Sequence, residues 1–495
     1  MRNNQNFERE IYGKVSGLIR LKTLNIVVVF DGNNEIEIAD VKQLSNKIDV
    51  GDFVRVVVVK DRNSERLRLL RIEKLHLDHN FVNKFEDLSK SFVAPVTQDN
   101  IVKSTAYEKL KPLFIKAINL INQAVIDRRP ILIRHHFDTD GYSGAIAIEK
   151  AITSLALKIN RDMQNNRNLL KRIPCTLPFY DLDEAVSDIS SFLDSSLDKE
   201  PLLILIDNGS TSEDVLGLRK LAIYNFDVIV IDHHVPLINE DGSFEVDSLT
   251  KVHINPYKVG SDSNITAGML GSEIAYMINP SLKDLDCLAA LSGIADRSNA
   301  EELTSYLELA KSKGCDEEFL KKLAKVVDYL TTSIRRKESK TFIENLFDFK
   351  NKIQQKTVNL IYPELVELEK KRINTLFKFL EKSEKNNIVI AKFNFENLIK
   401  RGDYPSSGKS AGLVIDELKQ KYDRVAVIAH GDDSMVVRTY GIDKDINDFI
   451  ALEQKVKPYT EIEGGGHMHA ASIRFIKAVR DEVMTDLEKW LVEND

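Results

Sequence analysis

Residues 8–77 alternate short apolar runs with polar turns in a pattern that predicts β structure. Runs such as NIVVVF and DFVRVVVVK are rich in valine and phenylalanine, and turn sequences such as DGNN and DRNSE separate them. Five strand-like runs in about seventy residues indicate a small barrel. We therefore predict an OB-like β-barrel over residues 1–80.

Basic and aromatic side chains are interleaved along these expected strands. They are Arg55, Lys60, Arg66, Arg68 and Arg71, with Phe30 and Phe53 nearby. Such interleaving suits a groove for single-stranded nucleic acid. Alternating arginines are also typical of the solvent-facing side of a strand, so the sequence leaves both interpretations open.

Helical and strand-like patterns alternate after a connector at residues 78–104. The apolar runs PILIRHH, LLILID and VIVIDHH have the length of buried strands, and helical segments separate them. Short apolar strands separated by helices indicate a parallel sheet covered by helices on both faces. We predict an α/β domain of this class over residues 81–300.

The pattern becomes charged and helical near residue 300. Runs such as EELTSYLELAKSKG and PELVELEKKRINTLFKFLEKSEK repeat apolar residues at helical spacing. A helical linking module is therefore expected over residues 301–385, as a spacer between two lobes or, alternatively, as a partner-docking surface. A second α/β unit is expected over residues 386–495, from NIVIAKF to the terminal helix after GGGHMHAASIRF.

Composition narrows the class of protein. The chain is 43% hydrophobic and 29% charged, as in ordinary globular proteins. A net charge of -7 argues against a uniformly basic nucleic-acid binder but is compatible with local basic patches. The three cysteines are far apart, which argues against a disulfide framework and a zinc-thiolate site.

Targeting signals and membrane segments are not apparent in the sequence. No apolar run reaches the length that spans a bilayer. The first residues, MRNNQNFEREIYG, lack the apolar core of a signal peptide. We therefore expect a cytoplasmic protein with no membrane partner.

Acidic and imidazole side chains gather in four apolar segments. These segments are ILIRHHFDTDG, LLILIDNGS, VIVIDHHVP and LAALSGIADRS. Six of the ten histidines lie in HHFD, DHH and GGGHMH. Because functional sites in open α/β sheets lie at the carboxyl ends of the strands, we expect these side chains to meet.

Clustered carboxylates repel one another and bind protons unless cations lie between them. Mixed carboxylate and imidazole ligands suit Mn²⁺, with Mg²⁺ as the alternative. Two such cations about 3.5–4 Å apart assist in-line displacement at phosphorus. The sequence therefore predicts a two-metal hydrolytic site.

The four segments, in this order, resemble the motifs of the DHH phosphoesterase superfamily. GGGHMHAASIRF resembles the glycine-rich motif of its companion DHHA1 domain, so the resemblance covers about residues 101–300 and 386–495. RHHFDTDGYSG in particular is similar to the archaeal RecJ-like exonucleases, which include the GINS-associated nuclease. The resemblance implies a two-lobed fold and a metal-dependent exonuclease for single-stranded DNA or RNA, acting in replication or repair.

The resemblance also assigns metal ligands. The candidates are His136, Asp138, Asp140, Asp207, Asp232, His233 and Asp296. Asp207 matches the bridging acid of the family. Arg134 stands where many members have a further ligand, and arginine cannot ligate a metal. His136 or His135 is therefore expected to take that place.

Catalytic and substrate-binding roles follow from the same motifs. Asp207, Asp232 and His234 are the catalytic candidates, with His234 near the phosphate. The substrate-binding candidates are Arg438, Gly464, Gly465, Gly466, His467, Ser406, Ser407 and Lys409. Consecutive glycines expose backbone N–H groups, and YPSSGKSAG is typical of a helix N-terminus that binds anions.

Two other functions are compatible with these motifs. The same two-lobed unit would serve a phosphodiesterase of short oligonucleotides or cyclic dinucleotides. The chain would alternatively be a replication-assembly subunit that docks the GINS and replicative helicase complex.

Overall fold

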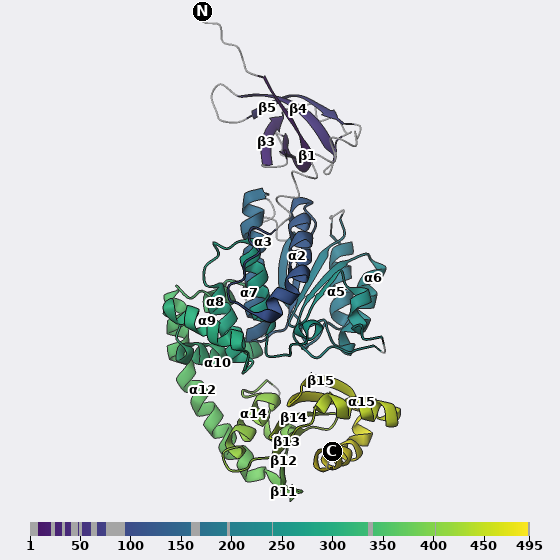
Figure 1. Cartoon of the computed structure of the whole chain (residues 1–495), viewed down its shortest axis with the longest axis vertical. Helices are drawn as coiled ribbons and strands as arrows, with labels where there is room; N and C mark the ends of the chain where they lie inside the picture. The colour runs from purple at the N-terminus through teal and green to yellow at the C-terminus, as the bar shows by residue number, and fades with distance from the viewer. Residues whose placement is uncertain are drawn as a thin grey trace, which may run out of the picture.

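The chain forms three bodies along its long axis: a barrel, a central lobe and a C-terminal lobe (Figure 1). The computed structural model describes residues 8–20, 25–31, 35–40, 48, 52–60, 67–75, 95–159, 169–195, 199–239, 241–334, 340–400 and 402–493. The predicted boundary at residues 80 and 81 lies outside the described residues.

The N-terminal body is a closed barrel with the strand order β1-β2-β3-β5-β4. Its strands are β1 (Glu8–Arg20), β2 (Asn25–Phe30), β3 (Glu35–Asp40), β4 (Phe53–Lys60) and β5 (Leu67–Lys74). Alternate valines of β4 point inward, and Val54, Val56 and Val58 are fully buried in the barrel core. The predicted small barrel is therefore confirmed.

Two arginines of β4 and β5, Arg55 and Arg71, lie on the outside of this barrel and pair with acids. Arg55 forms an ion pair with Glu10, and Arg71 forms one with Glu73. Pairing of this kind is typical of a solvated strand face. Arg66 and the side chain of Phe30 lie outside the described residues.

The central lobe is built on a five-stranded sheet in the order β10-β9-β8-β6-β7. Its strands are β6 (Ile131–His135), β7 (Leu170–Pro174), β8 (Leu202–Ile206), β9 (Asp227–Ile231) and β10 (Val252–Ile254). All neighbouring pairs are parallel, as the sequence predicts.

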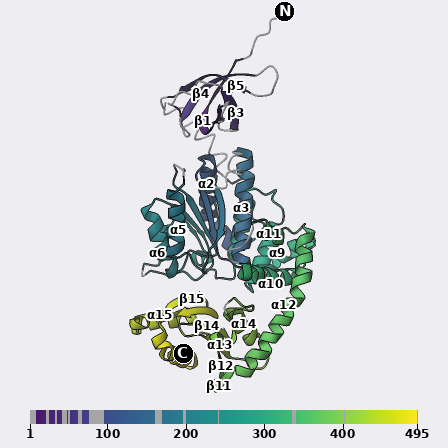
Figure 2. The same ribbon diagram turned by 180° about the vertical axis from the view of Figure 1, so that it is seen from behind.

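Helices cover both faces of this sheet (Figures 1 and 2). One layer contains α2 (Thr105–Ile126), α3 (Thr139–Ile159), α7 (Ala267–Ile278) and α8 (Leu285–Ala295). The other contains α5 (Leu182–Leu193) and α6 (Val215–Ile223). The pattern predicts a helix from Gly144, but α3 begins five residues earlier, so it includes Asp140 in its first turn.

Helices α3 and α7 pack backbone against backbone through two glycines. A Cβ atom on Gly271 would lie 2.9 Å from the Cα atom of Gly144. Real Cβ atoms do not approach that closely, so larger residues would separate the two helices. The close packing brings the N-termini of α3 and α7 together at the carboxyl edge of the sheet.

The charged segment expected to link two lobes is helical, but most of it belongs to the central lobe. It contains α9 (Glu301–Ser312), α10 (Glu317–Ile334), α11 (Lys340–Leu346) and α12 (Lys352–Phe379). Side chains of all four helices join the same hydrophobic core as α3 and α7. Only the second half of α12 reaches the C-terminal lobe (Figure 2).

The C-terminal lobe has a six-stranded sheet in the order β11-β12-β13-β14-β16-β15. Its strands are β11 (Glu381–Lys385), β12 (Ile388–Asn394), β13 (Val425–His430), β14 (Ser434–Tyr440), β15 (Glu463–His467) and β16 (Ala470–Arg474). Because β11 pairs with β12, this sheet begins before residue 386, where the sequence places its start.

Four helices and several short 3₁₀ segments complete the part of the fold that the structure describes. The helices are α13 (Phe395–Leu398), α14 (Ser407–Leu418), α15 (Ile446–Val456) and α16 (Arg480–Val492). The 3₁₀ segments are Ser212–Asp214, Glu245–Leu249, Pro256–Val259, Pro458–Thr460 and Lys477–Val479.

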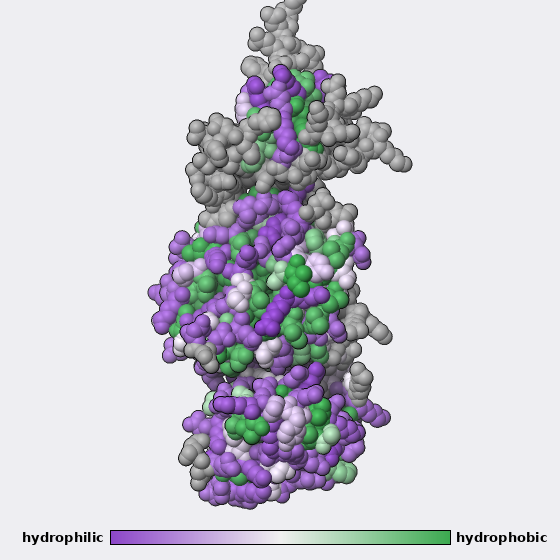
Figure 3. Space-filling model, turned by 90° about the vertical axis from the view of Figure 1, so that its right-hand side faces the viewer, coloured by the Kyte–Doolittle hydropathy of each residue, from purple (hydrophilic) through white to green (hydrophobic). Residues whose placement is uncertain are grey.

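Apolar side chains also reach the surface of the central lobe, as patches between polar residues (Figure 3). The exposed residues of α5 and α6 include Leu182, Val186, Leu193, Leu216 and Ile223.

Across the parts of the chain that the structure describes, none of the helices combines the length and apolar character that crossing a bilayer requires.

Candidate metal centre at the lobe interface

The register of the central sheet brings three of the four motifs to one edge. His135 pairs with Ile206, and Ile206 pairs with Ile231, so β6, β8 and β9 end in one row. The residues that follow this row carry the predicted acids and imidazoles. The fourth motif reaches the same edge from α8, where Asp296 is the C-terminal capping residue.

The first group of predicted ligands surrounds His136. Its Nδ1 atom lies 2.9 Å from Oδ2 of Asp138 and 3.2 Å from Oδ2 of Asp207. The turn is tight, because a Cβ atom on Gly141 would lie 2.3 Å from the carbonyl oxygen of His136. The glycine of the sequence DTDG is therefore required for this geometry.

The second group surrounds His233. Its Nε2 atom lies 3.5 Å from Oδ2 of Asp140, 3.2 Å from Oδ1 of Asp207 and 3.3 Å from Oδ2 of Asp296. Its Nδ1 atom donates a hydrogen bond to the Ser263 carbonyl at 2.7 Å, which leaves the Nε2 lone pair facing the carboxylates.

The environment of the His233 Nε2 atom indicates whether a cation would fit between the carboxylates. The atom is buried, and it makes no hydrogen bond with any group that the structure describes. A buried polar atom without a partner is costly. Carboxylate and imidazole donors pointing at one position suit a divalent cation such as Mn²⁺, so the residues present fit the metal that the sequence predicts.

Asp207 is common to both groups. Its Oδ2 atom faces His136 and its Oδ1 atom faces His233. The residue has a φ of 59°, in the left-handed region that non-glycine residues rarely adopt. A carboxylate held between two ligand sets in an unfavourable backbone conformation has the placement of a bridging ligand.

Proton affinities reflect this crowding. Burial and the nearby Asp207 raise the pKa of Asp140 to about 7. Burial and Asp140 raise the pKa of Asp296 well above its ordinary value. Burial opposes protonation of His233, but the carboxylates around it raise its pKa. These raised pKa values show that added positive charge, from protons or from a cation, stabilises the cluster.

Asp232 occupies the centre of the third motif. Its Oδ1 atom accepts hydrogen bonds from the His233 N–H and from Nδ1 of His234, both at 2.8 Å, and its Oδ2 atom accepts from the Ser210 N–H at 3.1 Å. Although burial opposes ionisation, the adjacent His234 holds its pKa well below the usual range. Asp232 thus holds the His234 imidazole and the backbone at His233, whereas the His233 imidazole is held by the Ser263 carbonyl.

The two adjacent histidines of the first motif point in different directions. His136 joins the metal-ligand candidates, whereas His135 is buried and donates from Nδ1 to the carbonyl of His136 at 2.7 Å. Burial and Arg172 lower the pKa of His135. Arg134 lies away from the cluster in an ion pair with Glu184 at 2.7 Å. Of the two candidates, the structure therefore brings His136 to the cluster.

The C-terminal lobe contributes His467 to the same centre. Its ring centroid lies 5.4 Å from that of His234, with an angle of 18° between the planes, and 5.2 Å from that of His233. Burial, together with these two imidazoles, lowers the pKa of His467 well below its ordinary value. The site is thus formed by both lobes.

The glycines before His467 have a structural cause that the sequence did not reveal. Gly464 and Gly466 have φ values of 145° and 150°. A Cβ atom on either would lie within 2.3 Å of a carbonyl oxygen of β16. Gly465 has more space, since a Cβ atom there would lie 3.7 Å from Oδ1 of Asn447.

Arg438 and the N-terminus of α14 lie side by side. A Cβ atom on Gly408 would lie 3.6 Å from Nη2 of Arg438, and burial lowers the pKa of this arginine to about 10. Ser406 stands at the N-cap position of α14 without a side-chain capping hydrogen bond, and Ser407 begins the helix. Lys409 points to α10, where its ammonium group forms an ion pair with Asp328.

Several contacts at the site carry no signal in the sequence. The N–H groups of Ala267 and Gly268 donate to the two oxygens of Asp140 at 3.0 and 2.7 Å. Ser292 also donates to Asp140. These donors come from α7 and α8, and only the packing of those helices brings them to the acid.

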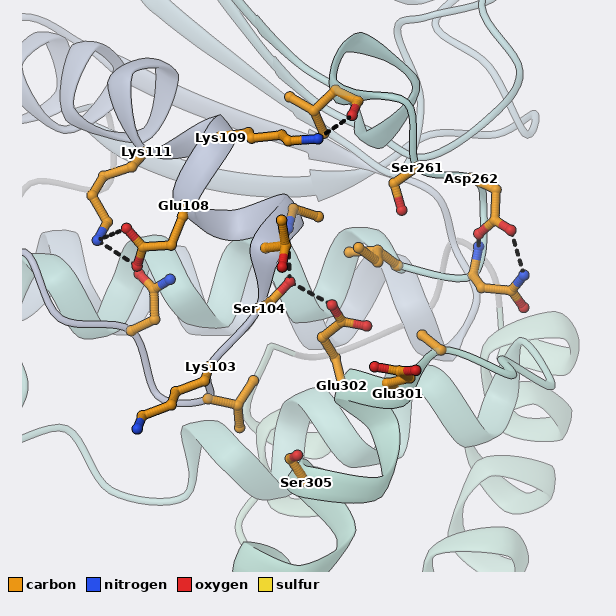
Figure 4. Close-up of a pocket in the computed structure, with 18 of the residues that line it drawn as sticks. Lys103, Ser104, Glu108, Lys109, Lys111, Ser261, Asp262, Glu301, Glu302 and Ser305 are labelled. Carbon is orange, nitrogen blue, oxygen red and sulfur yellow. Dashed lines mark hydrogen bonds and ion pairs between the residues drawn. The ribbon is translucent and has the colours of Figure 1, made fainter.

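A separate groove of about 1090 Å³ lies beside the loop of residues 259–265 (Figure 4). The Ser263 carbonyl of this loop accepts the hydrogen bond from His233. The groove lies between the N-termini of α2 and α9 and loop residues 259–265. Figure 4 shows Ser104 bonded to Glu302, and Lys111 paired with Glu108. Mixed charge and internal pairing give this groove no evident ligand preference.

Comparison with known proteins agrees with this architecture. Residues 130–294 match the model of the DHH family, N-terminal domain. An uncharacterized protein of Methanocaldococcus jannaschii is 31% identical over 516 residues, which cover 96% of this chain and 67% of that protein.

Solved structures show the same relation. The DHH domain of a member of a ribosomal-protein family is 34% identical with a TM-score of 0.78, over 84% of this chain and 98% of that chain. RecJ of Thermus thermophilus, in complex with Mn²⁺, is 14% identical with a TM-score of 0.54, over 84% of this chain and 58% of that chain.

The central lobe, with its clustered acids and imidazoles, has the fold of a DHH domain. The chain belongs to the DHH family, and its fold is related to that of RecJ.

Proposed function

We propose that the protein is a two-metal exonuclease for single-stranded DNA or RNA, with Mn²⁺ as the preferred cation and Mg²⁺ as the alternative. The observation that carries this proposal is the His233 Nε2 atom, which faces three carboxylates and has no hydrogen-bond partner among the described residues. Bound divalent cations would supply Lewis acidity that lowers the pKa of water and neutralises charge on a phosphodiester.

Residues of the central lobe are proposed to hold the cations. His136, Asp138, Asp140, Asp207, His233 and Asp296 would hold the cations, and Asp207 would contribute to both sites. Asp232 is proposed as a further ligand; its hydrogen bonds hold the backbone of His233 and the imidazole of His234.

The C-terminal lobe is proposed to hold the nucleic acid next to the metals. His467 and Arg438 would hold phosphate oxygens, together with backbone N–H groups at residues 464–466 and at Ser406 and Ser407. His467 supports this assignment because its ring lies nearly parallel to that of His234, with the ring centroids 5.4 Å apart. Nucleic acid would then lie between the lobes.

The test is digestion of an oligonucleotide labelled at either end, as DNA and as RNA, with Mn²⁺ and with Mg²⁺. Stepwise shortening of the labelled strand is expected in the wild type and not in Asp138→Ala or Asp232→Ala. A matched control is Asp241→Ala, which removes an exposed loop carboxylate that bonds only to nearby Ser243 among the described residues. Wild-type digestion by Asp232→Ala would show that the assignment is wrong.

A phosphodiesterase of short oligonucleotides or cyclic dinucleotides is the second candidate. The barrel, with exposed Lys60 and Arg68, favours a polymer over a dinucleotide. Rates on a dinucleotide and on a long single strand distinguish the two. A longer strand should be degraded faster at equal concentration if the polymer is the substrate.

A role in a replication assembly is compatible with nuclease activity. Helix α12 exposes Ile353, Leu360 and Phe379, which provide apolar surface for a GINS-type partner. Pull-down with a GINS complex, comparing the wild type with Leu360→Asp, tests this docking. Equal recovery of the wild type and Leu360→Asp with the GINS complex would show that Leu360 is not part of the docking surface.

A further inference from the structure

Asp328 lies in α10, outside the four motifs, and its carboxylate contacts both lobes. Its Oδ1 atom accepts hydrogen bonds from the Thr139 hydroxyl at 2.5 Å and from the Thr139 backbone N–H at 3.2 Å. Its Oδ2 atom forms an ion pair with the ammonium group of Lys409, which belongs to the C-terminal lobe.

Thr139 stands between two metal-ligand candidates. It is fully buried, it is the first residue of α3, and it separates Asp138 from Asp140. The first N–H groups of a helix have no partner within the helix, and a carboxylate is favoured at this end of the helix dipole. Asp328 therefore caps α3 from another helix and holds the turn that carries both acids.

The carboxylate of Asp328 also stabilises the charge of Lys409. Lys409 lies in the first turn of α14, where the helix dipole disfavours a cation. Its ammonium lies 5.9 Å from the centre of the Tyr404 ring, and that ring packs edge-on against Tyr329 of α10 at 5.1 Å. Lys409 is thus part of the contact that docks the C-terminal lobe on α10.

We propose that Asp328 is a positioning residue that couples docking of the C-terminal lobe to the metal-binding turn at Asp138 and Asp140. This inference rests on the proposed metal site. It gives Lys409 a role through Asp328, instead of the direct phosphate contact that the sequence suggests.

The first test measures binding of Mn²⁺ alone to the full chain, by the electron paramagnetic resonance signal of free Mn²⁺. Asp328→Ala should weaken Mn²⁺ binding by about tenfold, which is the size of effect that residues orienting metal ligands have. Thr139→Val keeps the shape of the side chain and loses the hydroxyl, so it should also weaken Mn²⁺ binding. Thr139→Ser keeps the hydroxyl and should bind Mn²⁺ as the wild type does.

The matched control is Asp416→Asn. It breaks another ion pair between the lobes, the one with Arg297 at 2.9 Å, without contacting the metal-binding turn. Its Mn²⁺ affinity should equal that of the wild type. Unchanged affinity in folded Asp328→Ala and Thr139→Val would overturn the inference. A wild-type protein that binds no Mn²⁺ would instead overturn the metal site and the inference together.

The second test separates coupling from phosphate contact. Without nucleic acid, Lys409→Met should weaken Mn²⁺ binding by about fivefold when Asp328 is present, and should have no further effect in Asp328→Ala. A residue that only touches phosphate would leave Mn²⁺ affinity unchanged. That result, or additive effects of the two substitutions, would overturn the coupling.

Discussion

Nε2 of His233 lies 3.2 Å from Oδ1 of Asp207, and this contact joins two motifs that are separated by α6 and β9 in the chain. The same carboxylate reaches His136 on its other side, at 3.2 Å. The shared acid makes the two ligand groups one centre, so a change at Asp207 should affect both cations.

Replacing Asp207 by Asn should remove the charge and keep the backbone, because asparagine tolerates the left-handed conformation found here. We expect Mn²⁺ affinity to fall by more than about tenfold, the effect typical of residues that only orient ligands, and hydrolysis to disappear. Isothermal titration calorimetry with Mn²⁺ measures the first effect. Tight binding at two sites in Asp207→Asn would contradict a bridging role.

The neighbouring histidines of the first motif should respond differently to the same substitution. His136→Ala should weaken metal binding and leave the melting temperature nearly unchanged. His135→Ala should lower stability by about 1–3 kcal/mol, because it removes a buried partner of Arg172, and leave the metal sites intact. Calorimetric melting and Mn²⁺ titration of both variants check this pair, and reversed results would exchange the two roles.

Metal binding should strengthen as pH rises. In the metal-free protein the pKa of Asp140 is raised to about 7, so a proton competes with the cation at lower pH. The apparent Mn²⁺ affinity should fall as pH is lowered from about 8 to about 6, with protons released on binding. Titrations in buffers of different ionisation enthalpy measure that release. Affinity independent of pH would show that Asp140 is not a ligand.

The same raised pKa has a consequence for folding. A carboxyl group with a higher pKa in the folded than in the unfolded state favours folding only while it is protonated. The contribution of Asp140 to the stability of the metal-free protein should therefore be lost as pH rises from about 4, the pKa of an unfolded aspartate, to about 7, and Mn²⁺ should offset the loss. Thermal melting across this pH range, with and without Mn²⁺, measures both effects.

Glycine packing gives a prediction about stability. Gly271→Ala places a Cβ atom 2.9 Å from Gly144, so it should destabilise the protein by about 1–3 kcal/mol by separating α3 from α7. Gly412→Ala is the control, because no described atom outside the adjacent backbone of α14 lies within 4 Å of its Cβ position. That change should be neutral or stabilising by up to about 1 kcal/mol. Urea unfolding of both variants compares them.

The central fold follows from the sequence because its strands are short, apolar and separated by helices. The parallel sheet, the barrel and the clustering of four motifs were all predictable from local patterns. Strand β11 was missed because EKSEK is entirely polar and exposed, so it has no apolar alternation to detect. It forms because β12 offers a free edge for pairing.

The surroundings of the site were less predictable, since they depend on distant contacts. The choice between His135 and His136 depends on where each side chain points, and adjacent residues share one sequence context. Asp328 was missed because it lies in a charged helix whose pattern indicates only an amphipathic face. Its partners Thr139 and Lys409 lie 189 and 81 residues away.

Helix α12 gives the molecule a mechanical property. Its 28 residues make a rod of about 42 Å, with a proline at position 363. The part beyond Pro363 is about 24 Å long, so a bend of about 10° there moves its far end by about 4 Å. A lever of this length converts a small change of helix curvature at Pro363 into a displacement of the C-terminal lobe relative to the central lobe.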